Sequence, residues 1–194
     1  MGFDFHGRCV GLIGTGKIGR VFAGIMRGFG CEVRGYDKFP NPAFVATGGI
    51  YTALDDLCAH ADIISLHCPL TPETHHIINP RTLAAMKPGT LLVNTSRGGL
   101  IDTEAAIASL KSGGLGGLAI DVYEQETDLF FQDLSSEIIA DDVIQRLVSF
   151  PNVIVTGHQA FFTREAVGTI AATTLESIAD FEAGRPLRNQ VALT

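Results

Sequence analysis

The chain has 194 residues, a formal net charge of −7 and 46% hydrophobic residues. This length predicts one domain, or one domain with a small appendage, and the composition predicts a well-buried core. The sequence has no cluster of Lys and Arg residues, which argues against nucleic acid and anionic membranes as partners.

The sequence also lacks the usual signals for membrane insertion or export. Its apolar runs are shorter than the about 18 residues that a membrane span needs. Met1–His6 does not have the basic-then-apolar pattern of a signal peptide. Four cysteines occur without C-x-x-C spacing, namely Cys9, Cys31, Cys58 and Cys68. Such cysteines indicate buried thiols in a reducing compartment, so we expect a cytoplasmic protein.

The first predicted elements form a glycine-rich strand–turn–helix. Cys9–Gly19 contains a short apolar strand, a G-x-G-x-x-G turn and a helix start, and Tyr36–Asp37 ends the next strand. This context is typical of a dinucleotide-binding βαβ unit. In such a unit Gly14 permits the tight turn, Gly16 lets the backbone approach a pyrophosphate, and Gly19 lets the helix pack against the strand.

The charges around this turn predict the choice of cofactor. The helix that begins near Lys17 would direct its free N–H groups and positive dipole end at the phosphates. Asp37 would accept hydrogen bonds from the ribose hydroxyls and repel a 2′-phosphate, so we expect NAD rather than NADP. Lys38 would soften that repulsion.

The rest of the chain alternates strands with helices. Strands are predicted at Cys9–Ile13, Glu32–Tyr36, Asp62–Leu66, Thr90–Asn94, Leu118–Val122 and Val153–Thr156. Helices are predicted at Lys17–Phe29, Ala53–His60, Arg81–Met86, Thr103–Lys111 and Arg164–Ala183, with Asp102 as an N-cap and Gly113 or Gly114 as a C-terminal stop. This order predicts an α/β fold with a doubly wound parallel sheet, a Rossmann NAD-binding domain.

One segment departs from this composition. Glu124–Arg146 is acidic and contains the apolar group Leu129–Phe131. We interpret it as a solvated surface excursion with one hydrophobic anchor.

Three polar residues follow predicted strands. Arg97, Glu126 and His158 come after the strands that end at Asn94, near Val122 and at Thr156. The carboxyl ends of parallel strands meet at one edge of the sheet, where open α/β sheets place their sites. There Arg97 would bind a carboxylate and polarise the adjacent carbonyl, and His158 would donate a proton. Glu126 would favour the protonated form of that histidine.

These residues lie in motifs that resemble the D-isomer-specific 2-hydroxyacid dehydrogenases. Val93–Asp102 resembles the central signature of that family, and Ala119–Glu126 resembles its acidic signature. Gly157–Thr163 and Asp128–Phe131 resemble the fermentative D-lactate dehydrogenase branch. The resemblance runs from Gly2 to Val191, and it implies hydride transfer between NADH and a small 2-keto acid, pyruvate giving D-lactate.

The resemblance implies roles for matching positions. Arg97 would bind substrate, His158 would be the proton donor and Glu126 its acidic partner. A cofactor site would be formed by Gly14, Gly16, Lys17, Ile18 and Gly19 at the phosphates, Asp37 at the adenosine ribose, His67, Cys68, Pro69 and Thr74 on the adenine side, and Thr95, Ser96, Arg97, Asp121 and His158 toward the nicotinamide.

The family pattern also predicts the organisation of the chain. Residues 1–163 would form the NAD-binding domain, and residues 164–194 a tail that belongs partly to a substrate domain. The long N-terminal segment of that second domain has no counterpart here, so we expect a truncated chain with weak or absent turnover. The family also implies a homodimer.

Several alternatives stay open or are disfavoured. A non-catalytic NAD-binding module of the corepressor type would keep the same motifs. Short-chain dehydrogenases need Tyr-x-x-x-Lys and serine hydrolases need Gly-x-Ser-x-Gly, and neither pattern occurs. A metal site formed by His67, His75 and His76 is a weaker interpretation than loop histidines near the cofactor cleft, so we predict no metal.

Overall fold

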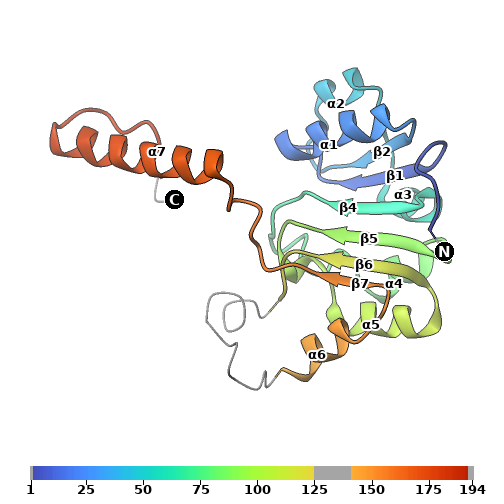
Figure 1. Cartoon of the computed structure of the whole chain (residues 1–194). Helices are drawn as coiled ribbons and strands as arrows, with labels where there is room; N and C mark the ends of the chain where they lie inside the picture. Colours follow the sequence, from blue (N-terminus) through green and yellow to red (C-terminus); the bar gives the residue numbers. More distant parts are fainter. Residues whose placement is uncertain (1, 125–140, 192–194) are drawn as a thin grey trace. The chain divides into compact units, whose positions relative to one another are not determined.

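The computed structural model describes residues 2–124 and 141–191 (Figure 1). They fall into two compact units, Met1–Gly157 and His158–Thr194. The sequence predicted a boundary slightly later, between residues 163 and 164.

The first unit contains a seven-stranded parallel sheet with the strand order β3-β2-β1-β4-β5-β6-β7 (Figure 1). The strands are β1 (Cys9–Ile13), β2 (Glu32–Tyr36), β3 (Ile50–Tyr51), β4 (Ile63–Leu66), β5 (Thr90–Asn94), β6 (Leu115–Ile120) and β7 (Val153–Val155). The sheet order reverses beside β1, between β2 and β4. This confirms the predicted doubly wound α/β fold.

Helices flank this sheet. They are α1 (Lys17–Gly28), α2 (Pro42–Ala46), α3 (Leu54–His60), α4 (Pro80–Ala85), α5 (Thr103–Ser112) and α6 (Asp142–Val148), with a 3₁₀ turn, η1, at Gly98–Leu100. The predicted ends of α5 are confirmed. Asp102 accepts a hydrogen bond from the Ala105 N–H, and Gly113 ends the helix with a left-handed φ of 77°.

The strands bury side chains on both faces of the sheet. In β1, Val10 and Leu12 pack in a cluster with Ala23 and Met26 of α1. Ile13 belongs to the larger cluster that also contains residues of α3, α4, α5 and α6. Burial on both faces explains why these strands appear in the sequence as nearly continuous apolar runs.

Three short elements were missed by the sequence analysis. Strand β3 has two residues at the sheet edge, too few to show a periodicity. Helix α2 has five residues, although Asn41 caps it and Pro42 begins it. The interpretation of residues 124–146 as a surface excursion is wrong for its last part, because α6 begins there and buries Ile144. Leu129–Phe131 lie outside the described residues.

The predicted start of β6 is also wrong. The strand begins at Leu115 rather than Leu118. The predicted start was too late because two glycines, which usually indicate a turn, lie within the strand. A β-carbon on Gly116 would lie 2.3 Å from the Gly89 carbonyl oxygen. Only glycine permits this close approach of neighbouring backbone.

The second unit contains one long helix, α7 (Arg164–Glu182). It begins where Thr163 accepts a hydrogen bond from the Ala166 N–H, close to the predicted start. Within the described part of the chain, no helix has the length and apolarity that a membrane crossing requires.

Candidate cofactor and active site

The glycine turn lies between β1 and α1, and each of its three glycines has a different environment. Gly14 has a φ of 99°, and a β-carbon there would lie 2.4 Å from the Cys68 backbone nitrogen. A β-carbon on Gly19 would lie 2.3 Å from the Gly14 carbonyl oxygen. A β-carbon on Gly16 would meet no atom within 4 Å. Gly14 and Gly19 are therefore needed for folding, whereas Gly16 keeps space open.

The N-terminus of α1 is suited to an anion. Gly16 is its N-cap and has no side chain that could accept from the first-turn N–H groups, and the first turn has no acidic residue. These N–H groups, including those of Lys17 and Ile18, therefore remain available to a phosphate.

A cavity of about 500 Å³ opens beside this turn. It is lined by Ile13, Gly14, Gly16, Tyr36, Asp37, Lys38, Phe39, His67, Cys68, Pro69, Thr71, Glu73, Thr74 and Ile77. Its size is in the range of cofactor pockets, which are about 300–1,000 Å³. The cavity combines an apolar wall, an open helix N-terminus and an acid at the end of β2, so the residues present fit an adenine dinucleotide.

Asp37 is fixed at the edge of this cavity by three hydrogen bonds. Its Oδ2 accepts from the Thr15 N–H (2.6 Å) and the Thr15 hydroxyl (3.0 Å), and its Oδ1 accepts from the Phe39 N–H (2.9 Å). Carboxylate oxygens have further lone pairs, which leaves acceptor capacity for ribose hydroxyls.

Lys38, the positively charged residue next to Asp37, forms an ion pair with Glu73. The Lys38 ammonium lies 3.6 Å from the Glu73 carboxylate, and both residues line the cavity. This exposed pair draws Lys38 away from the role of a 2′-phosphate ligand. The arrangement therefore supports the expected preference for NAD.

The cavity wall also carries two residues with shifted pKa values. Burial lowers the pKa of His67, whose Nε2 lies 3.0 Å from the Ser65 hydroxyl oxygen. Burial also raises the pKa of the Cys68 thiol to about 11. Both side chains are therefore neutral near pH 7, so this part of the wall carries no charge.

A second loop is joined to this wall. The Ser96 hydroxyl donates to the Cys68 carbonyl oxygen (2.6 Å). The buried Asn94 holds the loop, since its side-chain N–H donates to the Arg97 carbonyl oxygen (2.9 Å) and its Oδ1 accepts from the Ser96 N–H (3.0 Å). The Arg97 side chain is exposed and donates to the Ser96 carbonyl oxygen (2.6 Å).

Gly98 brings this loop against the end of β6. A β-carbon on Gly98 would lie 2.1 Å from the Tyr123 carbonyl carbon and 2.3 Å from the Glu124 nitrogen. Asp121 also follows β6, where its N–H donates to the Asn94 carbonyl oxygen (2.9 Å) and its carboxylate accepts from the Thr156 hydroxyl. The ends of β5, β6 and β7 therefore meet, as the topology of the sheet requires.

The candidate residues fall into four groups in the structure. Seven of them line the cavity: Gly14, Gly16, Asp37, His67, Cys68, Pro69 and Thr74. Lys17, Ile18 and Gly19 form the first turn of α1. Thr95, Ser96, Arg97 and Asp121 follow β5 and β6. Glu126 lies outside the described residues, and His158 belongs to the second unit, where it has a left-handed φ of 56°.

Some residues of the cavity wall were not among the candidates predicted from the sequence. Tyr36 and Phe39 flank Asp37, and Thr71 and Glu73 lie in the loop after Pro69. Their proximity to candidate residues in the sequence was an available signal, because a loop that supplies one ligand often supplies its neighbours.

Comparisons with known proteins agree with this geometry. Residues 1–160 match the model of the D-isomer specific 2-hydroxyacid dehydrogenase NAD-binding domain. The D-lactate dehydrogenase of Escherichia coli is 47% identical over 190 residues, which are 98% of this chain and 58% of that protein.

Solved structures give the same result. The pyruvate reductase of Chlamydomonas reinhardtii superposes with a TM-score of 0.93 at 45% identity, over 97% of this chain and 58% of that one. The D-lactate dehydrogenase of Aquifex aeolicus, solved with NAD and lactic acid, has a TM-score of 0.87 at 35% identity, over 95% of this chain and 56% of that one.

The chain thus spans a little over half the length of these relatives. The family match covers the glycine turn, the cavity and the Arg97 loop. The chain therefore belongs to the D-isomer specific 2-hydroxyacid dehydrogenase family and contains that family's NAD-binding domain.

Proposed function

We propose that this chain is the NAD-binding part of a dehydrogenase that interconverts pyruvate and D-lactate. The observation that carries the proposal is the cavity of about 500 Å³ whose lining includes both Gly16, at the N-terminus of α1, and Asp37. Relatives named as D-lactate dehydrogenases support the substrate class.

Each group would have a separate role in the reaction. NADH would supply the hydride. Arg97, exposed beside the end of β5, binds the carboxylate of the 2-keto acid through two parallel N–H···O bonds. His158 donates the proton to the carbonyl oxygen, and Glu126 stabilises the protonated form of that histidine. Asp121 accepts from the carboxamide of the nicotinamide.

Asp37 and Gly16 would set the cofactor half of the reaction. The Asp37 carboxylate binds the adenosine ribose, and the open space at Gly16 admits the pyrophosphate. The dehydrogenase relatives are longer than this chain, so we expect the 194-residue chain by itself to bind NADH with weak or no turnover.

The test is a fluorescence titration with NADH and NADPH, followed by a turnover assay with pyruvate. We expect saturable NADH binding, weaker NADPH binding, and slow or no oxidation of NADH by this chain alone. Failure to bind either nucleotide would contradict the cofactor assignment. Binding without turnover, even after the remaining sequence of a longer relative is supplied in trans, would favour the corepressor-type module.

We further propose that the protein is a homodimer. Helix α1 exposes Ile18, Val21 and Ile25 on one face, with Phe29 directly after its end, and each side chain is more than half exposed. Such a stripe at helical spacing supports an association surface. The double substitution V21E/I25E should halve the mass in sedimentation, whereas V45E on α2 should leave it unchanged.

We also propose a cytoplasmic location. The four cysteines are free in the structure, which supports a reducing compartment.

We propose a domain boundary near residues 163–164. Limited proteolysis tests this boundary, and cleavage confined to residues outside 158–170 would contradict it.

A further inference from the structure

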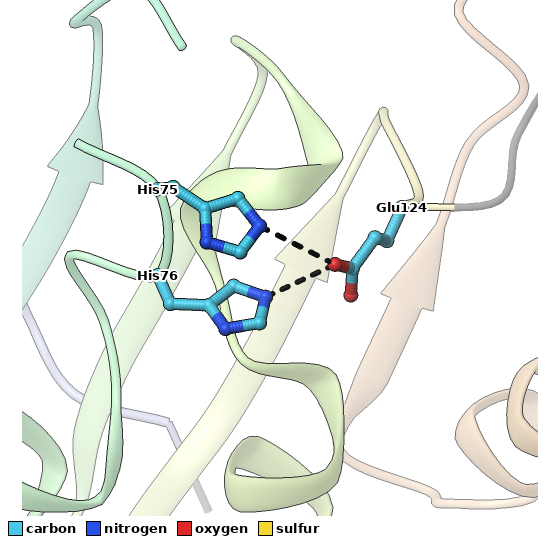
Figure 2. Close-up of side chains that lie close together, drawn as sticks. All are labelled: His75, His76 and Glu124. Atoms are coloured by element: carbon cyan, nitrogen blue, oxygen red, sulfur yellow. Dashed lines mark hydrogen bonds and ion pairs between the residues drawn. The ribbon is translucent and has the colours of Figure 1, made fainter. Parts of the chain in front are cut away.

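A cluster of two imidazoles and one carboxylate lies outside the cofactor cavity (Figure 2). His75 and His76 come from the loop between β4 and α4, and Glu124 follows β6. The His76 Nε2 lies 3.0 Å from the Glu124 Oε1, and the His75 Nε2 lies 3.9 Å from the same oxygen. Figure 2 shows both rings directed at that carboxylate.

The two histidines share one side of the loop because of the backbone at His76. Consecutive residues of an extended chain direct their side chains to opposite sides. His76 instead has a left-handed φ of 49°, and the two rings stack with centroids 3.9 Å apart. Left-handed φ is uncommon for a residue other than glycine, so the loop accepts an unfavourable conformation that brings both Nε2 atoms together.

The backbone fixes this arrangement before any ligand arrives. The His76 N–H donates to the Gly99 carbonyl oxygen (2.9 Å), and the Asn79 side chain donates to the His76 carbonyl oxygen (2.9 Å). On the other side, the main chain of Glu124 is packed against Gly98. The two halves of the cluster therefore rest on the same Gly98–Gly99 segment.

The spacing suits a transition-metal ion. A tetrahedral ion with bonds of about 2.0–2.1 Å holds its ligand atoms about 3.3 Å apart. The three ligand atoms here all lie within 4.8 Å of one another. Because the side chains are exposed or half-buried, small rotations are enough to close the remaining distance.

We propose that His75, His76 and Glu124 form a binding site for a divalent transition-metal ion of the zinc or nickel class. Two imidazole nitrogens and one carboxylate oxygen suit such ions, whereas magnesium and calcium prefer oxygen ligands alone. Three protein ligands leave at least one position for water.

Bound metal would link the loop after β4 to the end of β6 beside the Arg97 loop. Because the site is separate from the cavity, this proposal goes beyond the NAD-dependent function and does not depend on it.

The test is calorimetric titration of the untagged, chelator-treated chain with Zn²⁺ and Ni²⁺ in the absence of nucleotide. We expect one equivalent to bind and the melting temperature to rise with metal concentration. E124Q and H76A should each weaken binding about tenfold or more, as changes around metal sites commonly do. H60A removes an exposed histidine that pairs with Asp56 on α3, and should bind as the original chain does.

Cobalt gives a second readout that does not depend on stability. Co²⁺ bound at a nitrogen and oxygen site should give visible absorption bands in the original chain that are absent from H75A and H76A. The proposal is overturned if neither Zn²⁺ nor Ni²⁺ binds when added in clear molar excess over the protein. It is equally overturned if binding is unchanged in both E124Q and H76A.

Discussion

Gly98 lies directly against the main chain of Tyr123. A β-carbon on Gly98 would lie 2.1 Å from the Tyr123 carbonyl carbon, a separation that real β-carbons do not show. Since Tyr123 is itself buried, the backbone on that side has little room to move. This contact sets the distance between the Arg97 loop and the end of β6.

The substitution G98A should therefore destabilise the protein. Added volume in a packed site costs about 1–3 kcal/mol, and urea denaturation followed by circular dichroism should show a loss of that size. G24A is the matched control, because a β-carbon on Gly24 of α1 meets no atom within 4 Å. Alanine should raise stability there by up to about 1 kcal/mol. Equal midpoints for the two variants would contradict the packing argument.

Substitution of Gly16 should weaken cofactor binding, whereas substitution of Gly14 should weaken folding. G16V should lower NADH affinity about tenfold or more while leaving the unfolding midpoint nearly unchanged, because its side chain enters open space that the proposed pyrophosphate would occupy. G14A should instead lower the midpoint, because Gly14 has positive φ and contacts the Cys68 backbone. Fluorescence titration and thermal unfolding of both variants make the comparison. Unaltered NADH affinity in G16V would place the dinucleotide elsewhere.

Substitutions of Asp37 and of Glu73 should both lower the preference for NADH over NADPH. D37S removes the charge that repels a 2′-phosphate, and E73Q frees Lys38 to attract one. We expect the ratio of NADH to NADPH affinity to fall about tenfold in D37S, which is about 1.4 kcal/mol, and by less in E73Q. The exposed D55S is the control, since Asp55 pairs with Arg81 away from the cavity. A ratio that rises in D37S would argue against a ribose contact.

Asp62 should make stability depend on pH. Burial opposes ionisation of this carboxylate, but the Cys9 N–H (2.8 Å) and the Lys87 ammonium (3.1 Å) outweigh it, so its pKa is lowered. A carboxyl whose pKa is lower in the folded state stabilises the protein above its ordinary pKa of about 4, and that stabilisation is lost as the pH falls further.

The substitution D62N should cost about 1.5–3 kcal/mol at pH 7, the range for hydrogen bonds to charged groups. The difference from the original chain should shrink as the pH falls below about 4, where the original carboxyl becomes protonated. Urea denaturation at a series of pH values measures both. D55N, which removes an exposed charge, should show little pH dependence. A constant D62N penalty down to pH 2.5 would mean that the effect is not electrostatic.

Local signals made much of the fold predictable. Asp102 and Gly113 are located where helix boundaries demand a cap and a left-handed residue, so both ends of α5 could be read from the chain. β3 could not, because two edge residues carry no pattern. The start of β6 was missed because Gly116 is explained by a neighbouring backbone and not by its own sequence context.

The sites, too, could be predicted only where their residues lie close together in the sequence. The glycine turn and Asp37 are close in sequence, so their shared cavity was predictable. His76 and Glu124 are separated by 48 positions, and only the packing of Gly98 brings them together. The only metal site weighed from the sequence grouped His75 and His76 with His67 and was disfavoured, and His67 indeed lies in the cavity wall, paired with Ser65.

The residues that line the cavity all lie between Ile13 and Ile77, whereas the Arg97 loop and the end of β6 come later in the chain. Selection on the cavity and selection on the Arg97 loop would therefore act on separate stretches of the gene. A single recombination event between codons 77 and 95 would exchange the cavity while the Arg97 loop is inherited unchanged.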